Sequence, residues 1–175
     1  RFGNAILILR LHPSERQQYY TERYADSPLP IRIDTPDENF SAQSANDIGQ
    51  LDTLTHFVGL MKYSDVVINM ASTISLDAAL FDTPVISLKF NVSLPPDAWN
   101  SALGWHTLTH FEKLSNYGAI DLPTNMEELI ASIGNAILYP SEKREQRSQL
   151  IDDFSPNLHT SDSILNSLLC VCTNA

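Results

Sequence analysis

Short, purely apolar runs alternate along the chain with segments in which apolar residues recur at helical spacing. The clearest runs cover residues 5–11, 65–69 and 85–88, and they contain few polar positions. Such runs are typical of parallel strands whose two faces are both covered. Between the first two runs, the apolar residues of 51–61 recur every three to four positions, as expected for an amphipathic helix.

This pattern predicts an α/β protein. Strands are expected at 5–11, 31–33, 65–69, 85–88 and 117–122, and helices at 15–24, 51–63, 73–81, 124–138, 140–151 and 161–170. Residues 35–50 and 91–116 lack a clear period and are expected to be irregular. Alternating strands and helices predict a Rossmann-like parallel sheet with helices on both faces. We expect one nucleotide-binding domain over 1–175, with its C-terminal helices at about 125–170.

Two local signals set helix starts in this prediction. Ser72 follows the third apolar run and is a plausible N-cap, since its side-chain oxygen can accept a backbone hydrogen bond. Thr124 and Glu127 have the spacing of a capping box, with a hydroxyl at the N-cap and a carboxylate three residues later.

The composition is that of a soluble globular protein, with 43% apolar and 18% charged residues. No apolar run approaches the roughly 20 residues that a membrane-spanning helix needs. The first residues do not resemble a signal peptide. Because the chain begins almost directly in a strand-like run, we expect it to start inside a longer protein.

Charge and cysteine content narrow the function classes. The net charge is −10, from 11 basic and 21 acidic residues, which argues against a nucleic-acid partner. The two cysteines, Cys170 and Cys172, cannot form a disulfide framework or a four-ligand metal site. We therefore expect no metal and a cytoplasmic location.

The candidate chemistry lies at two predicted strand ends, because parallel α/β sheets bind ligands outside the carboxyl ends of their strands. One end is His12-Pro13, and the other is Asn69 to Thr73. Ser72, Thr73 and Ser75 supply hydroxyl groups there, and the N–H groups of a helix start can bind phosphate. Asp77 lies one helical turn after Thr73, roughly 6 Å along the axis. This distance suits a diphosphate and the ribose of one nucleotide. A carboxylate can accept hydrogen bonds from the hydroxyls of that ribose. The simpler interpretation is that Ser72 only caps the helix and that Asp77 is solvated.

The stretch from Asp65 to Ile86 resembles the donor-binding segment of GT-B glycosyltransferases. It is most similar to bacterial surface-polysaccharide enzymes and to the CDP-glycerol glycerophosphotransferases of teichoic acid synthesis. Leu9-Arg-Leu-His-Pro13 resembles the first strand of their C-terminal domain, and residues 124–139 resemble its late helix. The resemblance covers most of residues 5–150.

The resemblance implies a role for each matching residue. Ser72 and Thr73 would hold the phosphates of a CDP- or UDP-linked donor, Asp77 the ribose, and His12 would lie near the phosphates or base. Many relatives have glutamate at the position of Asp77 and glycine at that of Asp82. The glycine-rich loop after the first strand is absent, which favours the glycerophosphotransferase-like branch.

Other polar and aromatic residues are further candidates with structural alternatives. Arg10, Asn69 and His110 could contact the donor, although an edge charge for Arg10 and a core or rim role for His110 are the favoured interpretations. Trp99 and Trp105 could stack on a base, but packing is favoured for both.

The expected function is donor binding in a transferase that makes a cell-surface polysaccharide or a teichoic-acid-like polymer, without a cofactor. The catalytic base and the acceptor site would lie in a missing N-terminal domain, which could also contact the inner face of the plasma membrane. The isolated domain is expected to be inactive. The alternatives are a nucleotide-sugar 2-epimerase-like enzyme and a non-catalytic scaffold of the same fold.

Overall fold

The computed structural model describes residues 5–12, 15–35, 48–92 and 101–154, and for residues 48–53 it describes the backbone alone. The chain divides into two compact units, Arg1–Val58 and Gly59–Ala175. Helix α2 (Ile48–Tyr63) begins in the first unit and ends in the second.

The first unit contains a small parallel sheet. Strands β1 (Leu7–Arg10) and β2 (Ile31–Asp34) pair with Leu7 opposite Ile31, and helix α1 (Gln17–Arg23) connects them. Arg10 donates to the carboxylate of Asp34, and its guanidinium lies 5.1 Å from the centre of the Phe57 ring. His56 Nε2 lies 2.7 Å from the same carboxylate. These contacts tie the end of β1 to β2 and to α2.

The second unit contains a three-stranded parallel sheet in the order β3-β4-β5. The strands are β3 (Val67–Asn69), β4 (Val85–Ser87) and β5 (Ile120–Asp121). The central strand β4 is buried along its whole length, which explains its unbroken apolar run. Parallel pairing brings the carboxyl ends of all three strands to one edge of the sheet.

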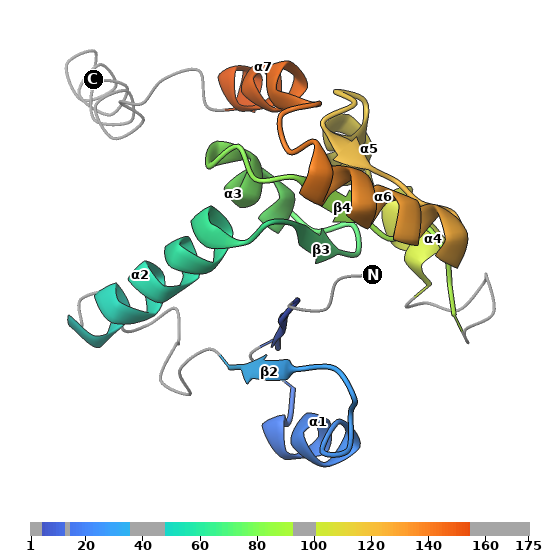
Figure 1. Cartoon of the computed structure of the whole chain (residues 1–175). Coiled ribbons are helices and arrows are strands. Elements are labelled where there is room, and N and C mark those ends of the chain that lie inside the picture. Colours follow the sequence, from blue (N-terminus) through green and yellow to red (C-terminus); the bar gives the residue numbers. More distant parts are fainter. Residues whose placement is uncertain (1–4, 13–14, 36–47, 93–100, 155–175) are drawn as a thin grey trace, which may run out of the picture. The chain divides into compact units, whose positions relative to one another are not determined.

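Helices pack on this sheet and on each other (Figure 1). Helix α3 (Ile74–Leu80) contacts β3 and β4, α6 (Met126–Leu138) contacts β4, and α7 (Arg144–Phe154) lies beside α3. The largest fully buried apolar side chains of this unit are those of Phe111, Ile86, Leu114, Leu150 and Val85.

The segment 91–116 is not irregular throughout, and the sequence-based prediction is wrong there. The structure contains α4 (Ala102–His106) and α5 (Thr109–Ser115). Ser101 caps α4 by accepting from the N–H of Leu103 at 3.2 Å, and the Asn91 side chain accepts from the N–H of Ala102 at 2.9 Å. Helix α4 thus has a partner outside itself in Asn91, and both helices are too short to produce a long helical period.

The predicted capping box is shifted by one residue. Asn125, not Thr124, is the N-cap of α6, and its side chain accepts from the N–H of Glu128 at 2.9 Å. Glu128, not Glu127, reaches back, accepting from the N–H of Thr124 at 2.7 Å and from its hydroxyl at 2.8 Å. The pairing of one capping side chain with one acidic residue three positions later is retained.

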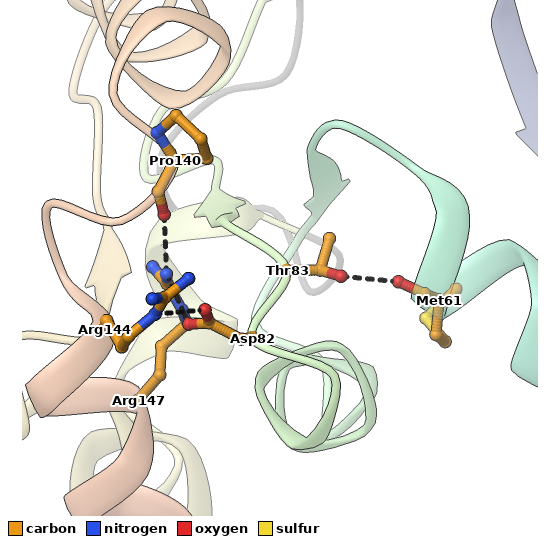
Figure 2. A network of polar contacts seen from close by, with 6 residues as sticks. All are labelled: Met61, Asp82, Thr83, Pro140, Arg144 and Arg147. Carbon is orange, nitrogen blue, oxygen red and sulfur yellow. Dashed lines mark hydrogen bonds and ion pairs between the residues drawn. The ribbon is translucent and has the colours of Figure 1, made fainter.

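Asp82, in the turn between α3 and β4, adopts a left-handed backbone conformation with φ of 57°. Glycine adopts this conformation without steric cost, so an aspartate is unusual here. Here the side chain has a use of its own, because Asp82 accepts from Arg144 Nε at 2.6 Å and from Arg147 Nε at 2.8 Å (Figure 2). Next to it, Thr83 donates to the carbonyl of Met61 at 2.7 Å. Asp82 thereby anchors α7 to the end of α3.

The fold is mixed α/β, with parallel strands in two small sheets. No helix among the described residues is long and apolar enough to cross a membrane. The expected helix at 161–170, with Cys170, lies outside the described residues, as does Cys172.

Candidate functional site

The candidate site is the turn that leads from β3 into α3. Its central residue, Ala71, has a left-handed φ of 47°, which is uncommon for a residue with a side chain. The Ala71 N–H donates to Ser87 Oγ at 2.8 Å, and Ser87 is fully buried at the carboxyl end of β4. The turn is therefore fastened to the neighbouring strand.

Asn69 organises the inner side of this turn. Its Oδ1 accepts from the N–H of Ser72 at 3.4 Å, and its Nδ2 donates to Ser75 Oγ at 3.0 Å. Ser75 is fully buried. The hydrogen bond between Asn69 and Ser75 therefore stabilises the turn. The sequence led us to expect a solvent-facing hydroxyl at Ser75, but this hydroxyl is buried.

Most backbone N–H groups of the turn have partners inside the protein. Thr73 precedes α3 as its N-cap and already has helical backbone angles, and Ser72 Oγ accepts from the N–H of Ile74 at 3.3 Å. The N–H of Ser75 donates to the carbonyl of Ser72, and that of Leu76 to the carbonyl of Thr73. The N-cap of α3 is Thr73 rather than the predicted Ser72, although Ser72 bonds to the first turn, and the expected set of free N–H groups is largely used up. Within the described chain, the N–H and hydroxyl of Thr73 have no partner.

Asp77 lies on α3 one turn beyond Thr73, and its residue surface is exposed. No other described residue forms a hydrogen bond or an ion pair with it. Partial burial of the carboxyl group nevertheless raises the pKa of Asp77 above its ordinary value, because burial disfavours the charged form. A carboxylate that is partly desolvated and unpaired can accept hydrogen bonds from a ligand.

His106 of α4 supports the turn from behind, a role that sequence reasoning did not assign to it. Its Nε2 lies 2.8 Å from the carbonyl oxygen of Leu88 and 3.5 Å from Ser87 Oγ. Because a carbonyl oxygen can only accept, His106 donates to Leu88. The ring packs edge-on against Phe111, with centroids 4.8 Å apart. The one signal in the sequence was a histidine beside a cluster of aromatic residues, which does not reveal this contact.

Burial lowers the pKa of His106, even though its hydrogen bond to Leu88 acts in the opposite direction. A neutral buried histidine stabilises the fold above its unfolded-state pKa of roughly 6.5, and this contribution is lost as the pH falls through the lower folded-state pKa. The wild-type chain should therefore lose stability as the pH falls from about 6.5 towards the lower folded-state pKa of His106. His106→Gln keeps an N–H donor but does not titrate, so its free energy of unfolding should fall less over this interval. Urea unfolding at several pH values measures the difference. His110→Gln is the control, because His110 is exposed on α5, and equal pH profiles for the two variants would contradict this assignment.

The remaining candidate residues lie elsewhere. Arg10 and His12 belong to the first unit, where Arg10 pairs with Asp34 and His12 is exposed. The pairing of Arg10 favours its structural interpretation. Pro13 lies outside the described residues, and so does Trp99. Trp105 is partly exposed on α4.

A search for metal ligands among the described residues finds no group of three or more His, Cys, Asp or Glu side chains that could hold an ion. The site that remains consists of two hydroxyls, one N–H group and one carboxylate, carried by Ser72, Thr73 and Asp77. No family model, no curated protein and no solved structure matches the chain.

Proposed function

We propose that this chain is a Rossmann-like, donor-binding domain of a GT-B-type glycosyl- or glycerophosphotransferase. It would bind the nucleotide of a CDP- or UDP-linked donor for synthesis of a cell-surface polysaccharide or a teichoic-acid-like polymer. The acceptor site and the catalytic base would lie in another domain of the full-length protein, on the cytoplasmic side of the membrane. The domain would bind the donor and would not catalyse transfer alone.

One observation carries the proposal: Asp77 is an exposed carboxylate without a partner among the described residues, one turn along α3 from Thr73, and Thr73 follows the carboxyl end of β3. Ligands of open α/β sheets bind at this edge. Thr73 can donate its N–H and hydroxyl to a phosphate, and Ser72 can donate its hydroxyl while its oxygen accepts from the N–H of Ile74. The proposal relies on these side chains rather than on a helix dipole, because α3 has only seven residues.

The test measures nucleotide binding by Asp77→Asn. We expect wild-type protein to show a higher melting temperature with CDP, CMP or UDP at millimolar concentration, and less of a rise with GDP or dTDP, because ligands of the native state stabilise it. Asp77→Asn should weaken binding in calorimetry by roughly tenfold, the loss of one or two hydrogen bonds to a charged acceptor.

Asp65→Asn is the matched control, because Asp65 is also exposed and precedes β3 at the opposite end of the strand. It should bind nucleotide like the wild type. Without nucleotide, Asp77→Asn should be at least as stable as the wild type at pH 7, since the raised pKa means that ionisation of Asp77 opposes folding above the unfolded-state value. Unchanged binding by Asp77→Asn would refute the ribose role.

A second candidate, a non-catalytic scaffold of the same fold, is favoured by the internal bonding of the turn. The N–H groups of Ala71, Ser72, Ile74 and Ser75 all have acceptors in the protein. A wild-type chain that binds none of the five nucleotides at millimolar concentration would select this function over donor binding.

A further inference from the structure

A pocket of about 260 Å³ lies between the C-terminal half of α3 and α7, at the other end of α3 from the candidate site. Leu80 and Ile151 contribute apolar surface to it. Arg144, Arg147 and Ser148 contribute hydrogen-bond donors, all from α7. The pocket therefore combines an apolar wall with a row of donors.

Arg147 is unusual because its side chain is only 3% exposed, yet it lines this pocket. Its Nε donates to Asp82, and its Nη2 donates to the carbonyl of Pro140 at 2.6 Å (Figure 2). Its Nη1 has no acceptor among the described residues. Every buried side-chain nitrogen or oxygen atom in the described part of the chain has a partner, so Nη1 is not a buried atom. A guanidinium bonded through two of its nitrogens thus keeps its third nitrogen without an acceptor in the described chain.

Arg144 places a second guanidinium at the same pocket, with its side chain 64% exposed. Only its Nε is bonded to Asp82, so its two terminal nitrogens are available within the described structure. Two guanidiniums share the single charge of Asp82, which leaves one positive charge in excess. Asp152, exposed at the same pocket and without a partner in the described chain, balances this excess, so the two arginines and two aspartates of the pocket sum to zero charge.

We propose that this pocket binds the anionic group of a small organic acid, a carboxylate or a phosphate monoester. Planar guanidiniums match the oxygen spacing of both groups and bind them through parallel N–H donors. The hydroxyl of Ser148 adds a further donor, and the side chains of Leu80 and Ile151 would cover the carbon part of the ligand. This proposal does not depend on nucleotide binding at the β3–α3 turn.

The experiment titrates the chain with butyrate, monobutyl phosphate and inorganic phosphate at low ionic strength. Binding is followed by calorimetry and by the Nε–H NMR signal of Arg147. We expect saturable binding of the two butyl compounds, weaker binding of inorganic phosphate, and a shift of the Arg147 signal. The relative affinities of butyrate and monobutyl phosphate show which anionic group the pocket prefers.

Two variants should act in opposite directions. Arg144→Gln removes an exposed donor and should weaken binding at least about threefold, whereas Asp152→Asn removes a repulsive charge and should tighten it by about twofold. Lys113→Gln is the control for net charge, because Lys113 is exposed on α5.

Three results would overturn the proposal. The first is that neither wild type nor Asp152→Asn shows saturable binding when the ligand is raised to 50-fold the protein concentration and up to about 20 mM. The second is that Arg144→Gln binds the ligand as tightly as wild type. The third is that Lys113→Gln loses as much affinity as Arg144→Gln. Inorganic phosphate that binds as tightly as monobutyl phosphate would overturn the role of the apolar wall.

Discussion

Replacing Phe111 with alanine should lower the free energy of unfolding by about 3 to 4 kcal/mol, the range for removing a fully buried aromatic ring. Phe111 has no exposed surface and packs edge-on against His106, which in turn donates to Leu88 at the end of β4. The loss therefore has two parts, a cavity in the core and a less rigid support behind the candidate site. Urea unfolding monitored by tryptophan fluorescence measures the total.

Phe111→Leu separates these parts. A leucine fills most of the cavity, so it should cost less than about 1.5 kcal/mol. Water that enters beside His106 in Phe111→Ala should bring its pKa back towards the ordinary value, because burial is the main cause of its lowering. The acid-side loss of stability should then be smaller in Phe111→Ala than in Phe111→Leu. A loss below 1 kcal/mol in Phe111→Ala would mean that this part of the core is loosely packed.

Replacing Asp82 with alanine should lower the free energy of unfolding by about 2 kcal/mol at pH 7. The partner Arg147 is almost fully buried and would remain charged without a carboxylate, a situation that costs about 3 to 5 kcal/mol in a buried pair. The expected value is reduced because Asp82 is 37% exposed, and solvent screens its interaction. Glu145→Ala, an exposed position on the same helix without an ion pair in the described structure, is the control and should change stability little.

The pH dependence and a glycine variant identify the cause of this loss. Partial burial raises the pKa of Asp82, but hydrogen bonds from Arg147 and Arg144 outweigh it and hold the pKa below its ordinary value. The stabilisation by ionised Asp82 is therefore present above its unfolded-state pKa of about 3.9 and is lost as the pH falls below it. Asp82→Gly lacks the carboxylate but accepts the left-handed φ, so it should be about 1 kcal/mol more stable than Asp82→Ala. Equal stability of the two would show that the backbone conformation is not strained.

Sequence patterns located most elements because those elements have long or apolar signatures. The expected strand at 85–88 is β4 (Val85–Ser87), and the expected helix at 73–81 is α3 (Ile74–Leu80). The continuous apolar run of β4 reflects burial on both faces, which a sequence records directly. Helices α4 and α5 have no comparable record because both are short, and α4 is stabilised by contacts of Ser101 and His106 with residues 10 to 19 positions away.

The candidate site was only partly predictable for the same reason. Hydroxyl and carboxylate residues near a strand end can be read from a sequence. The direction in which each side chain points depends on the turn, and the left-handed Ala71 turns Ser75 inward towards Asn69. The partners Ser87 and His106 come from other elements and carry no motif that joins them to Ser72.

The anchor between Asp82 and α7 also bears on how the chain folds as it is synthesised. Arg144 and Arg147 follow Asp82 by 62 and 65 residues. A growing chain therefore presents the β3–α3–β4 segment to solvent well before the arginines leave the ribosome, and the closing contacts come last. Contacts of such wide sequence separation form slowly because a long loop must close first. Until then, α3 lacks the contacts that α7 makes with it, and transiently exposed apolar surface of this kind favours aggregation.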